Sequence, residues 1–391
     1  MLLSIRTIKP KVFAVLLLFF STVVAFFPNI ITNPELYGMG RIMAFGSLLI
    51  LTILCTSFRS LKNSYIRSIA IQILLITALL LFFSSIGFHI SRTDIVVLCI
   101  SIWSICIGYS VSVNSVDVEF LLLVYGGLTV LLGLLTMFYF VGSVALTDYM
   151  YVIDTKNMVG QVVATGSIGL IIITLANKKN HVLKIGLVAI ATVLVFVLRC
   201  RTALAAYLVF FLLLIWRKLT RKQFFYFILL VLVGVALFHT QVFALFEDVF
   251  VGTKDISDLD SLSAGRMERN VAGLQFFRRY PVFGEMRTMS DLANIHNYVI
   301  KRLAAYGLFS FPFHVLYFYM LVTIVKQCWN ADFNDVWDAG ALMMIIPFFA
   351  SLLEPLSPFG PGLVQVIPFF FYGIYLKKYE GMKRLRLHSV V

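Results

Sequence analysis

The sequence predicts an all-α, polytopic integral membrane protein, and its composition and hydropathy pattern carry that prediction. Of the 391 residues, 60% are hydrophobic and only 13% are charged, and the mean hydropathy is +0.95. A soluble domain carries about a quarter of its residues as charges, so this chain has too little polar surface to cover a water-soluble globule. A soluble enzyme, a disordered chain and a secreted disulfide scaffold are therefore excluded.

Apolar runs of roughly 15 to 22 residues recur from one end of the chain to the other, and this length suits a membrane-spanning helix. They predict about twelve spans in a single multi-spanning domain, 1–391, with both termini on the same side. The runs lie at 12–27, 42–58, 70–88, 95–113, 120–141, 159–176, 185–198, 203–216, 224–243, 303–325, 339–353 and 362–375. The first follows Arg6, Lys9 and Lys11, and the absence of a small-residue cleavage site predicts an uncleaved span.

The distribution of Lys and Arg orients these spans. If both termini lie inside, the inner segments hold 19 of the 32 basic residues, as the positive-inside rule requires. Ten of the 13 outer basic residues are Arg, although topology alone does not prefer Arg to Lys outside. The planar guanidinium group of Arg binds oxyanions through two parallel hydrogen bonds, and a site for an oxyanion would explain this bias. The alternative is that the bias arises from chance and helix propensity. The five cysteines form no CxxC pair, so neither a disulfide framework nor a zinc site is expected.

One long hydrophilic segment, 247–297, separates the ninth and tenth spans and is expected outside. Its first part is acidic, and its second part predicts a helix over about 265–279 that Pro281 stops. The apolar stripe of that helix is Met267, Val271, Leu274 and Phe277, so we expect it to lie against the membrane surface or to cap the bundle. A second helix is expected from about Asp291 into the tenth span, with Gly307 as its weak point. His296 in its first turns lies in a positive dipole field, which favours the neutral imidazole that can accept a proton.

Two further arginines flank Cys200 at the outer junction of the seventh and eighth spans. Charges at that depth need partners, either an anionic ligand or lipid headgroups reached by snorkelling. We favour snorkelling for Arg199 and a ligand for Arg201.

Three patches in this order resemble the O-antigen polymerase and O-antigen ligase family of bacterial membranes. The specific part of the resemblance covers 199–308. The patches are Arg201-Thr202-Ala203-Leu204, then Gly265-Arg266 with Arg279-Tyr280-Pro281-Val282-Phe283-Gly284, and His296-Asn297-Tyr298 with Tyr306-Gly307-Leu308; Asn157-Met158-Val159-Gly160 is a weaker match. The chain departs from the family at Glu285-Met286-Arg287, where a small, glycine-rich stretch is usual, so the loop before His296 differs in shape.

The resemblance implies a GT-C-like, inverting, metal-independent glycosyltransferase without a cofactor. Its donor is a glycan on undecaprenyl diphosphate, at the periplasmic face of the bacterial inner membrane. Carried over by motif, Arg201 and Arg266 bind the diphosphate and His296 is the catalytic base. Arg279 and Arg199 are further candidates for the diphosphate. Asn297 and Glu354 are candidates for an acceptor contact or a structural role, and for Glu354, beside Pro355, we favour pairing with an Arg.

Asp258-Leu259-Asp260 matches the DxD motif of nucleotide-sugar enzymes, but an acidic loop outside the cell predicts no such role. Three functions stay open. A polymerase joins lipid-linked repeats, a ligase transfers the glycan to the lipid A core, and a flippase only moves a lipid-linked sugar. A cell-wall polymerase is a further possibility whose motifs are not evident. We lean to the polymerase, with a chain-length regulator and a flippase of the same pathway as partners and with no nucleic acid.

Overall fold

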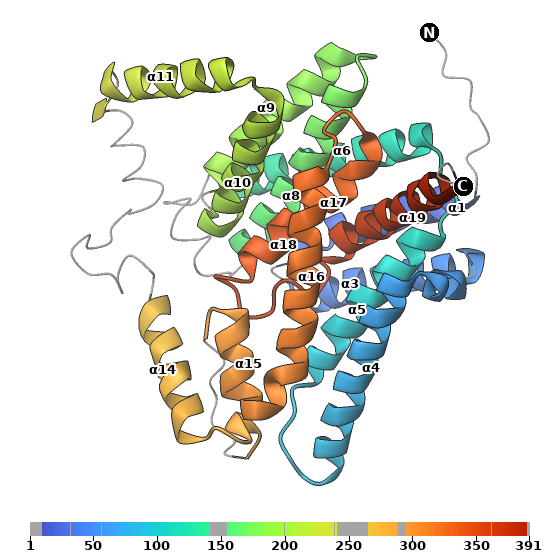
Figure 1. Cartoon of the computed structure of the whole chain (residues 1–391), viewed down its shortest axis with the longest axis vertical. Helices are drawn as coiled ribbons and strands as arrows, with labels where there is room; N and C mark the ends of the chain where they lie inside the picture. The colour runs from blue at the N-terminus through green and yellow to red at the C-terminus, as the bar shows by residue number, and fades with distance from the viewer. Residues whose placement is uncertain are drawn as a thin grey trace.

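The structure is a computed structural model that describes residues 10–31, 33–55, 57–140, 155–198, 200–237, 239–240, 265–287, 295–360 and 362–388. These residues form helices and turns, with no strand among them (Figure 1). Within them, six stretches are long and apolar enough to cross a membrane: Pro34–Cys55, Ser64–Ser85, Arg92–Ser110, Ser115–Tyr139, Asn157–Ala176 and Tyr298–Asn330. The protein is therefore an all-helical membrane protein, as its hydropathy predicts.

The helices follow the predicted apolar runs closely, and each of the twelve runs overlaps at least one helix. The first half contains α1 (Pro10–Val24), α2 (Pro28–Ile31), α3 (Pro34–Cys55), η1 (Ser57–Lys62), α4 (Ser64–Ser85), α5 (Arg92–Ser110), α6 (Ser115–Phe140), α8 (Thr155–Ala176) and α9 (His181–Val197). The second half contains α10 (Arg201–Lys218), α11 (Arg221–Leu237), α14 (Arg266–Arg279), η3 (Gly284–Arg287), α15 (Tyr298–Tyr306), η4 (Gly307–Ser310), α16 (Phe311–Asn330), η5 (Val336–Asp338), α17 (Ala339–Met343), α18 (Ile345–Ala350) and α19 (Val366–His388).

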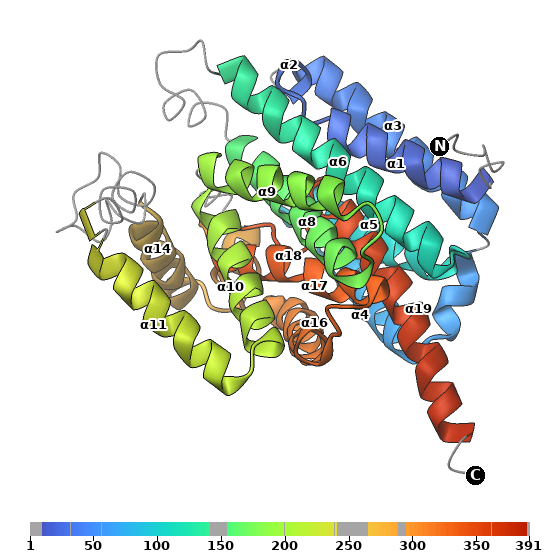
Figure 2. The same cartoon turned by 90° about the horizontal axis from the view of Figure 1, so that it is seen from above.

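Helix α8 occupies the centre of the bundle, since 83% of its apolar window is buried. It packs against α6, α9 and α10, as Figure 2 shows from above. Helices α5 and α19 approach each other very closely because glycines line their contact. A Cβ at Gly108 would lie 1.9 Å from the Phe370 carbonyl oxygen, and one at Gly373 would lie 2.2 Å from the Ile105 carbonyl oxygen. Lipid tails are as apolar as the helix surface, so the hydrophobic effect does not drive two membrane helices together. Their association depends on close van der Waals packing, which small residues allow.

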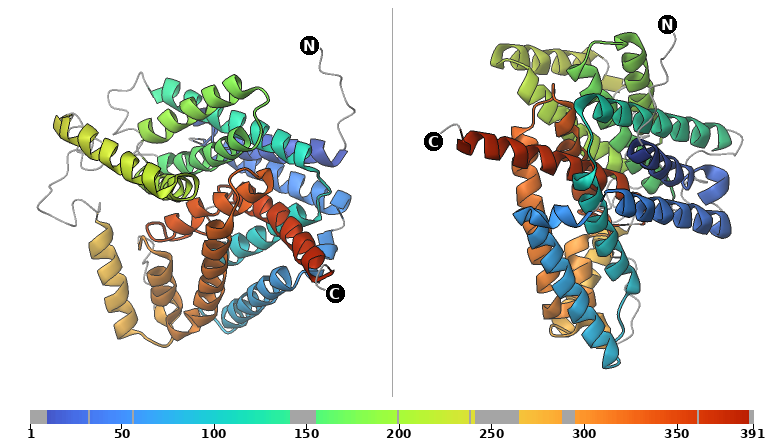
Figure 3. Two further views of the ribbon diagram at one scale, coloured as in Figure 1. Left: turned by 45° about the horizontal axis from the view of Figure 1, so that its top comes forward. Right: turned by 90° about the vertical axis from the view of Figure 1, so that its right-hand side faces the viewer.

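The chain reverses direction at Gly307, the expected weak point, so one continuous helix from 291 into the tenth span is wrong. His296 also precedes α15, which begins at Tyr298, and does not lie in its first turns as expected. Gly307 has φ +57°, and α15 and α16 on either side of it lie antiparallel (Figures 1 and 3). The ring of Tyr298 stacks on that of Tyr317 at 5.2 Å, and a ring nitrogen of His314 lies 3.1 Å from the Val299 carbonyl oxygen. The tenth span thus begins at α16, and α15 is a separate short helix beside it.

Helices α14 and α15 lie side by side and run in the same direction. Gly273 lets them touch, since a Cβ there would lie 2.7 Å from Cδ1 of Ile295. At their far end, Gly284 and Gly307 both have positive φ, and a Cβ at Gly307 would lie 2.5 Å from the Pro281 carbonyl oxygen. The sequence patches 279–284 and 306–308 therefore pack directly against each other.

The predicted helix over 265–279 is confirmed as α14, and three residues of its predicted apolar stripe are exposed. Met267, Val271 and Leu274 are all exposed, whereas Gly273 is buried against α15. The apolar stripe therefore points away from the rest of the chain, which suits contact with lipid.

Candidate functional site

The candidate site is centred on the carboxylate of Glu354, in the loop between α18 and α19. A guanidinium nitrogen of Arg266 lies 3.3 Å from its Oε1, and the side-chain amide of Asn157 donates to the same oxygen at 3.2 Å. Nδ1 of His296 lies 4.0 Å from Oε2. The Glu354 side chain is only 14% exposed, and those of Arg266 and His296 are 22% exposed. Three different helices thus place polar side chains around one half-buried carboxylate.

Each of these partners sits at the beginning of a helix. Arg266 opens α14, directly after Gly265 with φ +71°, and Asn157 lies in the first turn of α8. Asn297 caps α15 by accepting a hydrogen bond from the backbone N–H of Ile300 at 3.1 Å. The first N–H groups of a helix and its dipole give a helix N-terminus a partial positive charge. Side chains from the starts of α8 and α14, and His296 just before α15, therefore lie beside the Glu354 carboxylate.

Arg201 reaches the same corner because α10 starts against α8. Sγ of Cys200 lies 3.5 Å from Oδ1 of Asn157, the residue that binds Glu354. A Cβ at Gly160 would lie 2.4 Å from Cβ of Cys200, so only glycine allows this approach. Arg201 is the first residue of α10 and is half-buried, so the start of α10 lies near Asn157.

His296 is held between Arg269 and Glu354. A guanidinium nitrogen of Arg269 lies 3.2 Å from Nε2 of His296. A guanidinium can only donate, so Nε2 is the accepting nitrogen and the imidazole proton resides on Nδ1, which faces the Glu354 carboxylate. The imidazole therefore has its lone pair on Nε2, beside Arg269.

The loop that carries Glu354 is fixed to the start of α15 by its backbone. The side-chain amide of Asn297 donates to the Leu352 carbonyl at 3.1 Å, and the backbone N–H of Tyr298 donates to the Ser351 carbonyl at 3.0 Å. Asn297 thus has a structural role here, because it caps α15 and positions the Glu354 loop at the same time.

A buried ion pair anchors the other side of α15 to α5. Arg302 and Asp94 form a hydrogen-bonded pair with side chains 2% and 5% exposed. The Tyr306 hydroxyl donates to the same carboxylate oxygen at 2.5 Å, and the Arg302 guanidinium lies 5.0 Å from the centre of the Tyr298 ring. A charge pair out of water needs such additional partners. The pair fixes the rotation of α15 and with it the direction of His296.

The structure brings together Arg266, His296, Asn297 and Glu354, and Glu354 pairs with Arg266. Arg201 follows Cys200, which contacts Asn157 beside this cluster. The structure does not bring Arg279 to them. Arg279 is exposed at the last turn of α14, about 20 Å from Arg266 along the helix axis at 1.5 Å per residue. Arg199 and the Asp258-Leu259-Asp260 motif lie outside the described residues.

Sequence reasoning overlooked the roles of Arg269 and Asp94. Arg269 was counted among the outer arginines without a role of its own. Its spacing of three from Arg266 puts both residues on one side of α14. Asp94 could have been found as a carboxylate within an apolar run, since such residues are rare and need partners. Among the described residues, no three His, Cys, Asp or Glu side chains gather in a way that could hold a metal ion.

Comparison of the sequence with models of protein families finds no match, and comparison with curated protein sequences finds none either.

Proposed function

We propose that this protein is a membrane glycosyltransferase that polymerises oligosaccharide repeats linked to undecaprenyl diphosphate. The observation that carries the proposal is the meeting of Arg266, His296 and Glu354 beside the starts of α8, α14 and α15. This combination provides positive charge for a diphosphate, a nitrogen base for a hydroxyl, and apolar surroundings for a polyprenyl chain. The sequence resemblance at 199–308 points to the same chemistry.

The proposed setting is the bacterial inner membrane, crossed twelve times, with both termini in the cytoplasm. The Lys-rich segments then lie inside, as the positive-inside rule requires. The segment 247–297 and the cluster around Glu354 face the periplasm, where lipid-linked repeats are available but nucleotide sugars are not.

The donor diphosphate is proposed to bind where the starts of α8, α10, α14 and α15 converge. Helix N-termini bind phosphate groups through their N–H groups and dipole. Arg201 and Arg266 add guanidinium groups, which bind phosphate oxygens bidentately. Neutralised in this way, the diphosphate leaves the anomeric carbon without protonation, so the reaction as proposed needs no acid at the leaving group.

The acceptor sugar hydroxyl is proposed to lose its proton to Nε2 of His296. In the transfer step, the bond from the anomeric carbon to the acceptor oxygen forms as the bond to the diphosphate oxygen breaks. The leaving diphosphate keeps the electron pair, and the hydroxyl proton moves to His296. The Glu354 carboxylate facing Nδ1 then stabilises the imidazolium, as a carboxylate does for the histidine of a catalytic triad.

Arg269 is proposed to link donor binding to this step. It occupies Nε2 of His296 in the structure, so the base becomes available only when the guanidinium turns elsewhere. A phosphate oxygen is a stronger acceptor for a guanidinium than a neutral imidazole. Binding of the donor diphosphate would draw Arg269 away and free the base.

The glycan made by a deletion strain tests this function against its alternatives. Loss of a polymerase leaves a lipid A core carrying a single repeat. Loss of a ligase leaves a bare core with accumulated lipid-linked polymer, and loss of a flippase leaves lipid-linked repeats that never reach the periplasm. The proposal predicts the first phenotype, and either of the other two would contradict it.

A further inference from the structure

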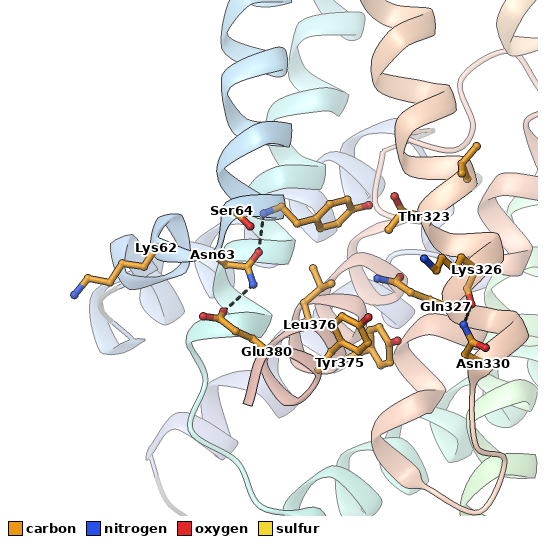
Figure 4. Close-up of a pocket in the computed structure, with 13 residues that line it drawn as sticks. Lys62, Asn63, Ser64, Thr323, Lys326, Gln327, Asn330, Tyr375, Leu376 and Glu380 are labelled. Carbon is orange, nitrogen blue, oxygen red and sulfur yellow. Dashed lines mark hydrogen bonds between the residues drawn. The ribbon is translucent and has the colours of Figure 1, made fainter. Parts of the chain in front are cut away.

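A pocket lies at the C-terminal end of α16, the end away from the turn at Gly307. It has a volume of about 630 Å³ and is lined by the start of α4, the last turns of α16 and the middle of α19 (Figure 4). Its lining residues are Lys62, Asn63, Ser64, Tyr65, Val322, Thr323, Lys326, Gln327, Asn330, Tyr375, Leu376, Tyr379 and Glu380. Several of these residues can bind a charged ligand, and none of them takes part in the proposed glycosyl transfer.

The two sides of the pocket carry opposite charge. On the α16 side, Lys326 supplies an ammonium group. Gln327 is oriented by the Tyr372 hydroxyl, which donates to its Oε1 at 2.8 Å, and its amide nitrogen turns into the pocket. On the α4 side, Glu380 accepts hydrogen bonds from the Asn63 amide at 2.8 Å and from the Tyr109 hydroxyl. Figure 4 shows Glu380 beside Asn63 and Lys326 beside Gln327, across the pocket from each other, while Lys62 extends away from it.

The position of the pocket identifies the kind of ligand. Tyr65, Tyr319 and Tyr379 cluster around it, and Tyr is the residue expected where a spanning helix meets the lipid headgroups. Beside the pocket, α16 has further exposed apolar side chains, Phe318 and Val325, which suit contact with lipid tails. A phospholipid is the ligand with a charged group at this depth and apolar chains alongside.

We propose that this pocket binds a zwitterionic phospholipid headgroup of the phosphoethanolamine kind. The phosphate lies against Lys326 and Gln327, and the primary ammonium lies against Glu380 and the ring of Tyr379. The bonds from Asn63 and Tyr109 orient the Glu380 carboxylate at the α4 side of the pocket. A headgroup without a primary ammonium lacks the donor for the Glu380 carboxylate. The lipid would hold α4, α16 and α19 together.

Native mass spectrometry of the purified full-length protein tests the proposal without any glycan substrate. The protein is given equal amounts of dioleoyl phosphatidylethanolamine, phosphatidylglycerol and phosphatidylcholine. We expect phosphatidylethanolamine to be retained several-fold over the other two. Lys326→Gln and Glu380→Gln should each weaken its binding about tenfold, the value of one charge-assisted contact. Lys179→Gln, which changes an exposed lysine outside the pocket, should leave binding unchanged.

Equal retention of the three lipids, or undiminished binding by Lys326→Gln, would overturn the proposal. Lys326→Gln alone suffices for this test if Glu380→Gln, which disturbs the bonds from Asn63 and Tyr109, fails to fold. Soluble O-phosphoethanolamine distinguishes a lipid from a small solute. It should compete only at concentrations far above those of the lipid, and binding as tight as that of the lipid would contradict a membrane ligand.

Discussion

The guanidinium of Arg266 lies 3.3 Å from the carboxylate of Glu354, although 88 residues separate them in the chain. The contact joins α14 to the loop between α18 and α19, and His296 at the start of α15 faces the same carboxylate. A carboxylate this close to the proposed diphosphate site keeps the arginine oriented when no donor is bound. Exchange of the Arg266 contact from Glu354 to a phosphate is the central event of the proposed donor binding.

The shape of the guanidinium should matter at Arg266 and not at Arg279. We predict that Arg266→Lys lowers transfer activity about 10- to 100-fold, because one charge-assisted hydrogen bond of a bidentate pair is lost. Arg279→Lys, at the exposed far end of the same helix, should keep activity close to wild type. Both are measured as glycan elongation in membranes at matched protein level. Equal losses in the two variants would show that Arg279 also reaches the donor.

Arg269 contacts His296 in the structure and is proposed to contact the donor diphosphate, so its substitution should change donor affinity. We predict that Arg269→Gln raises KM for the lipid-linked donor, because a phosphate contact is lost, while the glutamine amide can still donate to His296. Kinetics with a titrated donor separate KM from kcat. Arg278→Gln, an exposed change on the same helix, serves as the control. An unchanged KM in Arg269→Gln would remove the proposed exchange between His296 and the diphosphate.

The Asp94–Arg302 pair should behave as a buried ion pair. We predict that Asp94→Asn or Arg302→Met alone destabilises the protein by about 3–5 kcal/mol, because each leaves a charge without its partner out of water. The double variant Asp94→Leu with Arg302→Met should recover much of this loss. Thermal unfolding in detergent measures all three. A double variant as unstable as the sum of the single variants would mean that the two residues act independently.

The reversal of the chain at Gly307 should depend on glycine for two separable reasons. Gly307→Ala places a Cβ 2.5 Å from the Pro281 carbonyl oxygen and also strains a positive φ, so we predict a marked loss of folded protein. Gly87→Ala is the matched control, because Gly87 also has positive φ but open space around it. Its cost should be about 1–2 kcal/mol, the strain term alone. Comparable yields and unfolding temperatures for the two variants would contradict close packing at Gly307.

The helices could be predicted from the sequence because apolar runs of spanning length indicate membrane helices without reference to any tertiary contact. The sequence indicated Gly307 as a weak point but not a full reversal, since a single glycine within a helical pattern does not distinguish a bend from a turn. The reversal there depends on Pro281, which packs against Gly307 from a different helix end. Hydropathy does not record such a contact.

The candidate site was predictable where a residue type is unusual for its position. Arg201, Arg266 and His296 stand out as charged or titratable groups at helix starts. Arg269 does not stand out, because arginines are ordinary on the polar face of an amphipathic helix. The pairing of Arg302 with Asp94 could not be predicted, for another reason. Asp94 lies 208 residues away, and a single sequence carries no signal that pairs them.

Release of undecaprenyl diphosphate by purified protein tests the catalytic role of His296 most directly. The wild type and His296→Gln are each given a synthetic lipid-linked repeat as both donor and acceptor, and free diphosphate carrier and elongated glycan are measured together. We expect the wild type to release one carrier for each new glycosidic bond. His296→Gln should be slower by about 10²- to 10⁴-fold, with donor binding retained, because general-base help of this size is lost. Transfer by His296→Gln at the wild-type rate, or elongation by neither protein, would contradict the account.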